Sequence, residues 1–218
     1  MIKFNLQLFI AFFGSLFGFI VISYLVHAEH LAAFDQEFID MVQGLQAEWL
    51  TVIMGFFTYI GSTRFIVILT IVAFFFLFNV LKHRMEIFIL LSVVFCTPIL
   101  NRFLKLYFHR ARPDLNRLIE IGGYSFPSGH AMNAFSFYSI LAFLLWRHVP
   151  TRLGRIAVII SSSVMILAIG ISRVYLGVHY PSDILGGFLA SGLWITAVIW
   201  FFQRYMEKRG AAERLQAQ

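Results

Sequence analysis

Two histidines and an aspartate lie among basic residues in three short stretches of this sequence. The stretch that ends at Pro113 places Lys105 and Arg112 on one side of a helix end, because nearly two helical turns separate them. The sequence FPSGH, which ends at His130, is a small-residue turn opening a helix, so its backbone N–H groups point outward and suit an anion. The third stretch, SRVYLGVHYPSD, ends at Asp183.

These residue types are suited to holding and transferring a phosphoryl group. The candidate phosphate-binding residues are Lys105, Arg112, Ser128 and Gly129 through their backbone amides, and Arg173. Arginine is well matched to phosphate because its planar fork donates two hydrogen bonds at once. Asp183 lies within reach of His179, and a carboxylate that fixes an imidazole tautomer suits a nucleophile. His130 is then the candidate general acid and base.

Each residue also has an ordinary explanation. Lys105 and Arg173 are placed where long basic side chains reach from a helix end to the membrane surface. His179 and Asp183 could be a helix-capping pair. These explanations do not account for the order and spacing of all three stretches, so the combined pattern favours a catalytic site.

The elements that must position these residues are membrane helices. The 218 residues are 60% hydrophobic and only 13% charged, whereas soluble domains are nearer half apolar and a quarter charged. The net charge of +6 is explained by membrane topology before nucleic-acid binding is considered. The single cysteine, Cys96, excludes an intrachain disulfide and a multi-cysteine metal site.

We predict an all-α, polytopic protein that forms one integral membrane domain over residues 1–218, with its motif core at 105–183. Six transmembrane helices are expected, since about 20 apolar residues cross a bilayer. They are predicted at residues 4–26, 65–81, 85–107, 131–146, 156–172 and 183–203. Residues 49–65 are too short in their apolar part to cross, and Arg64 interrupts them, so they are predicted as an interfacial or re-entrant helix.

Residues 29–48 carry five acidic and no basic side chains, with apolar residues at helical spacing. They predict an amphipathic helix on the outer side, either on the membrane surface or as a packing cover over the helix bundle. Basic residues in the loops at 82–84 and 147–155 place those loops, and both termini, in the cytoplasm. The three motif stretches then lie on the extracytoplasmic side of the plasma membrane.

The motif K-x6-RP, followed by PSGH and by SR-x5-H-x3-D, resembles the three-part signature of the type 2 phosphatidic acid phosphatase superfamily, and every signature position is present. The six-helix layout is similar to the membrane branch of that superfamily, which includes bacterial phosphatidylglycerophosphatases and undecaprenyl pyrophosphate phosphatases. The resemblance implies hydrolysis of a lipid phosphomonoester or pyrophosphate through a phosphohistidine. The implied substrates are phosphatidylglycerol phosphate, undecaprenyl pyrophosphate and phosphatidic acid.

The resemblance also implies a role for each residue. His179 would attack phosphorus, Asp183 would orient it, and His130 would protonate the leaving oxygen and later activate water. The cations and amides would stabilise the phosphoryl oxygens, so no metal or other cofactor is expected. The remaining basic residues of the loop, His109, Arg110 and Arg117, fall outside the signature; solvent exposure is favoured over contact with substrate or lipid headgroup.

Other functions remain open. A lipid transporter or a non-enzymatic lipid-binding protein fits the predicted helices, although transporters collect ionisable residues near the bilayer midplane rather than at one interface. The related vanadium haloperoxidases hold vanadate in the same kind of cage but are soluble. Neither oligomeric state nor preferred substrate follows from the signature.

Overall fold

A computed structural model describes residues 6–81, 84–114 and 116–216. Within these ranges every regular element is helical and no strand occurs, which agrees with the predicted all-α class. The elements are α1 (Leu6–His27), α2 (Ala32–Gln43), α3 (Glu48–Ile60), α4 (Thr63–Phe75), the π-helix η1 (Phe76–Leu81), α5 (Arg84–Phe108), α6 (Gly129–His148), α7 (Arg152–Tyr175) and α8 (Pro181–Gln216).

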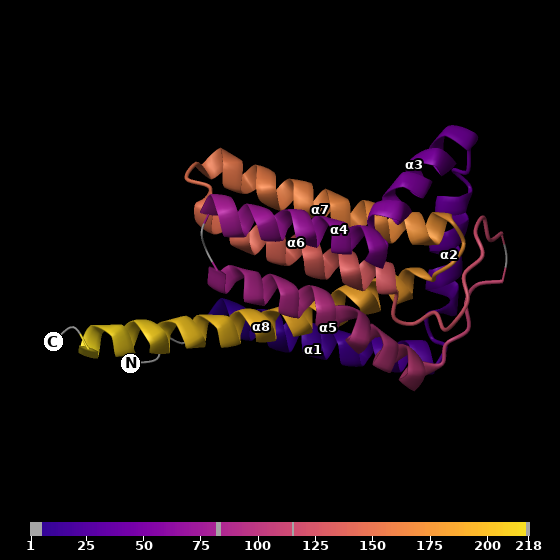
Figure 1. The fold of residues 1–218 in the computed structure, drawn as a ribbon. Coiled ribbons are helices and arrows are strands. Elements are labelled where there is room, and N and C mark those ends of the chain that lie inside the picture. Colours follow the sequence, from indigo (N-terminus) through magenta and orange to yellow (C-terminus); the bar gives the residue numbers. More distant parts are fainter. Residues whose placement is uncertain (1–5, 82–83, 115, 217–218) are drawn as a thin grey trace.

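The long helices run side by side as a bundle, and the short helices α2 and α3 cover one end of it (Figure 1). Helix α6 contacts α5, α7 and α8 and so occupies the middle of the bundle. The interior is built from apolar side chains such as Leu90 of α5, Ile140 and Leu144 of α6, and Ile195 of α8. By contrast, only 6% of the most apolar stretch of α1 is buried within the protein, which is expected for a helix facing lipid.

Among the described residues, four helices are long and apolar enough to cross a membrane: α1, α5, α7 and α8. A fifth span results if α3 and the α4–η1 segment are counted together, although the two are bent by 59° at the break. Gly61 lies at this bend, where a Cβ atom would come within 2.4 Å of the Ile169 side chain of α7. The predicted helix at residues 49–65 therefore ends at Ile60, and a new helix begins at Thr63.

The fourth predicted span, at residues 131–146, corresponds to α6, which is not among the apolar spans. Its buried face carries polar side chains that are paired inside the bundle: Asn133 donates to Thr63 at 2.8 Å, and Ser136 accepts from Thr97 at 3.0 Å. A helix surrounded by protein can carry such groups because neighbouring helices satisfy them. Six crossings therefore remain a prediction, and the structure supports four or five.

The predicted outer helix is shorter than expected. Helix α2 covers residues 32–43 rather than 29–48, and the chain turns at Gly44. Its Ile39 and Val42 are buried against Val174 and Val178, at the junction between α7 and α8. The helix thus packs over the bundle end. One of its acidic residues, Asp35, is buried rather than on the charged outer surface, and is only 1% exposed.

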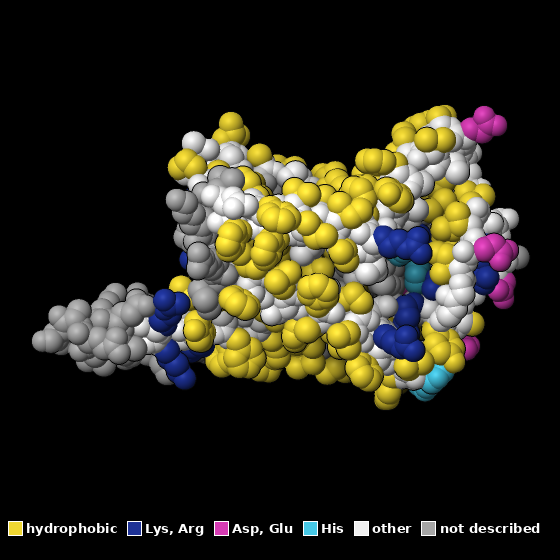
Figure 2. All heavy atoms as spheres, viewed as in Figure 1, with side chains coloured by type: hydrophobic (Ala, Val, Ile, Leu, Met, Phe, Trp, Pro, Cys, Tyr) yellow, Lys and Arg dark blue, Asp and Glu magenta, His cyan; other side chains and the backbone are white. Residues whose placement is uncertain are grey.

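Basic side chains lie at both ends of the apolar flanks (Figure 2). At one end they surround a hollow that contains a histidine, and at the other they lie near the C-terminal part of the chain. The loop at 82–84, used above to predict topology, includes residues 82–83, which lie outside the described residues. Arg152 and Arg155 begin α7 at the end opposite the hollow.

Candidate active site

The three motif stretches converge at the end of the bundle that α2 covers. Lys105 lies in the last turn of α5, and Arg173 lies in the last turn of α7. Ser128 caps α6, so Gly129 and His130 form its first turn. Asp183 lies in the first turn of α8, which begins at Pro181 because proline is well suited to the first position of a helix. Four helix ends and the loops that join them therefore build the site.

The loop between α7 and α8 turns sharply before His179. Gly177 has φ of +72°, and a Cβ atom there would come within 2.5 Å of the Asn116 carbonyl oxygen. Only glycine combines this backbone conformation with such a close approach. The amide of Leu118 also donates to the Leu176 carbonyl at 3.1 Å, which holds the preceding loop against this turn.

His179 and Asp183 form a buried pair. The Nδ1 atom of His179 lies 3.2 Å from Oδ2 of Asp183, and the two side chains are 2% and 0% exposed. The same carboxylate oxygen accepts from the Tyr180 amide at 2.9 Å and from the hydroxyl of Ser125. Since Asp183 accepts at Nδ1, we assign the proton to that nitrogen. Nε2 of His179 is then the unprotonated nitrogen.

His179 is neutral over the physiological range. Burial lowers its pKa from the usual 6.5 to about 3, and the positive charges of Arg173 and Arg112 add to this, whereas Asp183 opposes it. A lowered pKa means that the imidazole takes up a proton only in more acidic solution. The unprotonated nitrogen required of a nucleophile is therefore present without a separate deprotonation step.

Selective ¹⁵N labelling of histidine tests this directly. We expect the His179 nitrogens to report a neutral ring with the proton on Nδ1 from pH 8 down to about pH 5, since the unperturbed group titrates near 6.5. Comparison with the spectrum of His179→Gln assigns the signals. A transition of the assigned signals centred near pH 6.5 would contradict the buried, neutral imidazole.

Three cations surround this pair without a carboxylate partner. In the described part of the chain, Lys105, Arg112 and Arg173 form no ion pair. Arg173 is 1% exposed, donates to the Thr58 hydroxyl, and has an Nε donor that is buried with no partner. Lys105 donates to the Ser125 carbonyl at 3.2 Å and to that of Tyr124. A buried cation without a counter-charge is costly, so this arrangement is suited to an anion.

Arg112 lies beside the unprotonated nitrogen of His179. Its Nη1 is 3.1 Å from Nε2 of His179 and donates to the Val178 carbonyl at 2.7 Å, while other donors bind the Gly122 and Gly123 carbonyls. Burial lowers the pKa of Arg112, and repulsion from Arg117 adds to the effect, although Asp183 opposes it. Its positive charge is thus only partly compensated at the position where the imidazole lone pair points.

His130 faces the same cluster from α6. The positive charges of Arg173, Arg112 and Lys105 all act on it. Its ring also lies beside the α3–α4 bend, because a Cβ atom on Gly61 would be 3.5 Å from its Cδ2. The structure therefore brings both histidines of the signature to one set of cations.

The structure corrects one expectation about backbone donors. The amide of Ser128 donates to the Asp183 carbonyl at 3.0 Å, so it joins α6 to α8 and does not point freely at an anion. The Ser128 hydroxyl accepts from the Ala131 amide at 3.4 Å as a helix cap. Gly129, at the first residue of α6, is the member of the pair whose N–H lies at the helix terminus.

The structure also corrects the prediction that Arg110 is exposed to solvent. Its guanidinium binds Asp183 at 2.7 Å and Asp35 at 2.8 Å, so it lies within the site. Burial alone would lower the pKa of Arg110, but the charges and hydrogen bonds of the two carboxylates outweigh it and raise that pKa. Ser125 was missed as well. Asp35 was missed too, because in the sequence it is one of several acidic residues of residues 29–48 and nothing distinguishes it from the others.

The other loop residues outside the signature point elsewhere. Arg117 pairs with the exposed Asp114 at 2.6 Å, and His109 packs edge-on against the Tyr124 ring. Within the described ranges, no group of three or more His, Cys, Asp or Glu side chains is arranged to hold a metal ion. The anionic partner of the cluster would thus meet basic side chains and not a carboxylate-rich metal site.

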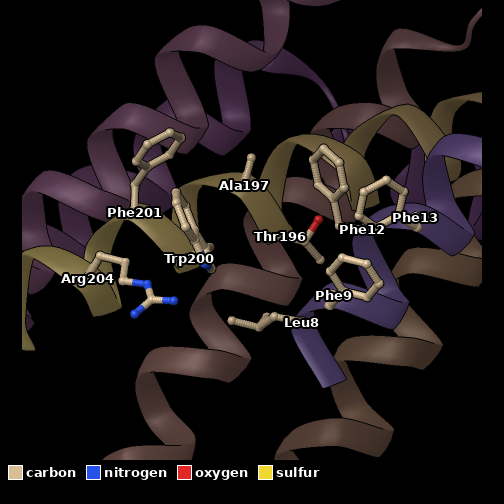
Figure 3. Close-up of a pocket in the computed structure, with 9 residues that line it drawn as sticks. All are labelled: Leu8, Phe9, Phe12, Phe13, Thr196, Ala197, Trp200, Phe201 and Arg204. Atoms are coloured by element: carbon tan, nitrogen blue, oxygen red, sulfur yellow. The ribbon is translucent and has the colours of Figure 1, made fainter. Parts of the chain in front are cut away.

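Cavity size alone does not mark this site. A groove of about 400 Å³ lies between α1 and α8, lined mainly by phenylalanines and tryptophan, with Arg204 at its edge (Figure 3). It lies toward the C-terminal part of α8, away from Asp183 in the first turn (Figure 1). A smaller groove of about 180 Å³ lies between α2, α7 and α8 and reaches Pro181.

Comparison with known proteins places these features in a family context. Residues 86–207 match the profile of the PAP2 superfamily. Phosphatidylglycerophosphatase B of Bacillus subtilis is 34% identical over 176 residues, which cover 78% of this chain and 84% of that protein. Lipid A 4'-phosphatase of Porphyromonas gingivalis is 32% identical over 169 residues, covering 71% of this chain and 68% of the relative.

The fold is similar to a solved structure as well. The crystal structure of a transmembrane PAP2-type phosphatidylglycerolphosphate phosphatase from Bacillus subtilis superimposes with a TM-score of 0.76. The alignment covers 91% of this chain and 97% of that one at 28% sequence identity. The resemblance noted from the three motifs is therefore supported by both sequence and structure.

Proposed function

The chain belongs to the PAP2 superfamily, and from this premise we propose that it is a lipid phosphate phosphatase whose active site lies at the extracytoplasmic membrane interface. It is a phosphoric monoester hydrolase of the kind found in its relatives, and its whole length acts as one membrane domain. Its termini lie in the cytoplasm in this proposal, since Arg147, Arg152 and Arg155 lie at the bundle end opposite the site.

The observation that carries the proposal is the set of unpaired cations around a neutral histidine. Lys105, Arg112 and Arg173 surround the imidazole, and Asp183 is already engaged by His179 and Arg110. A phosphoryl group would bring negative charge to this cluster and would satisfy the buried Nε of Arg173. The cations would stabilise the additional charge on the equatorial oxygens in the transition state.

The reaction would proceed in two displacements. Nε2 of His179 attacks phosphorus, the bond from phosphorus to the leaving oxygen breaks, and His130 transfers a proton to that oxygen. The intermediate is a phosphohistidine with its Nδ1 proton held by Asp183. His130 then takes a proton from water, the water oxygen attacks phosphorus, and the bond to His179 breaks to release inorganic phosphate.

The phosphate-binding residues in this proposal are Lys105, Arg112, Arg173 and the Gly129 amide. Ser128 contributes through the turn that presents Gly129, because its own amide is bound to Asp183. Metal ions are not required, since positive side chains take the place that a metal would have beside the phosphoryl oxygens. The leaving group is a lipid alcohol for a phosphomonoester and a lipid monophosphate for a pyrophosphate.

The substrate's hydrocarbon tail would remain in the bilayer while its headgroup enters the cationic cluster. The groove between α2, α7 and α8 supports this, because Phe34, Phe38 and Phe188 line it and Pro181 connects it to the catalytic loop. Three lipids that combine a hydrocarbon tail with a phosphate or pyrophosphate headgroup are phosphatidylglycerol phosphate, undecaprenyl pyrophosphate and phosphatidic acid. The relatives' names include a phosphatidylglycerophosphatase and a lipid A phosphatase, so both glycerolipids and larger lipids belong in a substrate panel.

The test is phosphate release by the detergent-purified protein, measured in parallel with and without EDTA. We expect release from at least one of the three lipids at a rate that EDTA does not change, and the ratio of rates then identifies the substrate class. Vanadate, which resembles the five-coordinate transition state, is expected to inhibit. Folded protein that releases no phosphate from any of them would instead favour lipid transport or lipid binding.

A further inference from the structure

We propose that Asp35 and Arg110 are positioning residues, which hold Asp183 in place for His179 through a buried carboxylate–guanidinium–carboxylate chain. The inference rests on the proposed phosphatase function. Neither residue belongs to the signature, and Asp35 lies outside the residues 86–207 that match the family profile. Helix α2 would thus contribute to catalysis although it is remote in sequence from the motifs.

The guanidinium of Arg110 joins the two carboxylates directly. Its Nη1 donates to Oδ1 of Asp183 at 2.7 Å, and its Nη2 donates to Oδ2 of Asp35 at 2.8 Å. Asp35 and Asp183 are 1% and 0% exposed, so little solvent screens these contacts. Because the guanidinium is planar and rigid, it fixes the separation and orientation of the two carboxylates.

Asp35 also holds the start of α8. Its Oδ1 accepts from the Ser182 amide at 2.9 Å, and its Oδ2 accepts from the Ser182 hydroxyl at 2.6 Å. The same hydroxyl accepts from Nη1 of Arg110 at 2.7 Å. Ser182 directly precedes Asp183, so Asp35 constrains both the backbone of the catalytic aspartate and the arginine that binds its side chain.

Helix α2, which carries Asp35, is held in place by contacts that do not involve the Asp35 carboxylate. Ile39 and Val42 of α2 are buried against the α7–α8 junction. Gln43, the last residue of α2, donates to the Val174 carbonyl at 3.4 Å, and Gln46, beyond the helix, donates to the Tyr175 carbonyl at 3.2 Å. These contacts keep α2 in place when the Asp35 carboxylate is altered, so its effect on Asp183 can be measured in a folded protein.

Arg110 differs from the phosphate-binding cations in what surrounds it. Its terminal nitrogens are engaged by Asp35, Asp183 and Ser182, and its guanidinium stacks on the Tyr180 ring at 4.2 Å. The carboxylates raise its pKa, whereas burial lowers that of Arg112. Arg110 therefore acts on the reaction through Asp183 and not by contact with the phosphoryl group.

Asp35→Asn is the first variant to test. We expect kcat to fall about 10- to 100-fold, because a small misplacement of a catalytic group has effects of this size, while KM stays unchanged since Asp35 does not touch substrate. Asp35→Glu, which restores the carboxylate, should recover part of the rate. The matched control is Asp40→Asn on the same helix, because Asp40 is exposed and its carboxylate bonds only to Gln36 among the described contacts.

A double-mutant cycle with Arg110→Gln tests whether the residues act as one chain. The double variant should be no slower than the slower single variant, since removing either link interrupts the same connection. Effects on kcat that multiply would contradict the chain. The His179 ¹⁵N signals provide a second readout: loss of the single Nδ1–H tautomer in Asp35→Asn is expected, and retention of it alongside a wild-type kcat would overturn the proposal.

Folding of each variant is checked by its gel-filtration profile and unfolding temperature in detergent. If Asp35→Asn does not fold, Arg110→Gln tests the same chain, because it removes the guanidinium that binds both carboxylates; a wild-type kcat there would overturn the inference. His179→Ala is assayed in parallel. If it remains active, the proposed function fails; if it is inactive while Asp35→Asn matches Asp40→Asn, only the positioning role fails.

Discussion

His179→Ala should remove turnover, with a loss of at least about 10⁴-fold in kcat, as is found when a catalytic nucleophile is deleted. The imidazole is neutral, its Nδ1 proton is held by Asp183, and its Nε2 lies 3.1 Å from Nη1 of Arg112. No other side chain takes the nucleophile role in the proposed mechanism. The assay is phosphate release from the preferred lipid, measured with EDTA present.

The variant should remain folded, because alanine leaves a small cavity at a site where Asp183 keeps its bonds to Arg110, Ser125 and Tyr180. His30→Ala is the matched control, since His30 is exposed and lies outside the cluster. Wild-type protein quenched in alkali should contain phosphohistidine, whereas His179→Ala should not. Turnover near that of the control would remove His179 from the nucleophile role.

Asp183→Asn is expected to have the second-largest effect, a loss of about 10³- to 10⁴-fold in kcat, as when the aspartate of a His–Asp pair is replaced by its amide. The carboxylate accepts on both oxygens: Oδ2 faces His179, Ser125 and Tyr180, and Oδ1 faces Arg110. An amide must turn its NH₂ group toward one of these two sets of donors.

Either orientation is harmful. An NH₂ group toward His179 makes Nδ1 the acceptor and moves the ring proton to Nε2, which removes the attacking lone pair. An NH₂ group toward Arg110 places two hydrogen-bond donors against each other, so the bond to Asp183 is lost. The buried guanidinium then keeps only the Asp35 carboxylate as a partner of opposite charge. ¹⁵N spectra of His179 distinguish the two cases, and a lower unfolding temperature is expected in the second.

Asp114→Asn provides the comparison, because Asp114 lies in the same region of the chain as Arg112 but is 89% exposed and pairs with Arg117. Exposed ion pairs contribute little to stability, so this variant should match wild type in both rate and unfolding temperature. An Asp183→Asn rate within tenfold of the Asp114→Asn rate would show that the carboxylate charge is not needed to orient His179.

Much of this site could be predicted from the sequence because its chemistry is encoded locally. His179 and Asp183 are four residues apart at a helix start, and Lys105 lies in the last turn of α5. Arg112 was expected on the same helix end, but α5 ends at Phe108, so helix periodicity does not place it. The apolar composition likewise predicted membrane helices, and the described residues form helices throughout their regular elements. Such features depend on neighbours in sequence, so periodicity and spacing suffice to find them.

The tertiary structure decided which polar groups meet across the bundle. Asp35 seemed to belong to an exposed acidic face, yet it is buried because Arg110 reaches it from the loop after α5. The Ser128 amide, expected to face an anion, is taken by the Asp183 carbonyl. These pairings depend on how α2, α6 and α8 pack, and spacing along the chain carries no information about them.

The same reasoning applies to α6. Taken alone, its sequence reads as a membrane span of ordinary kind, but its polar side chains are retained because α5, α7 and α8 surround it. The sequence by itself determined the reactive groups and the apolar helices that carry them, since both follow from residue type and short-range spacing. Only the tertiary structure determined how buried charges are compensated, because a counter-charge is supplied by whichever element packs against it.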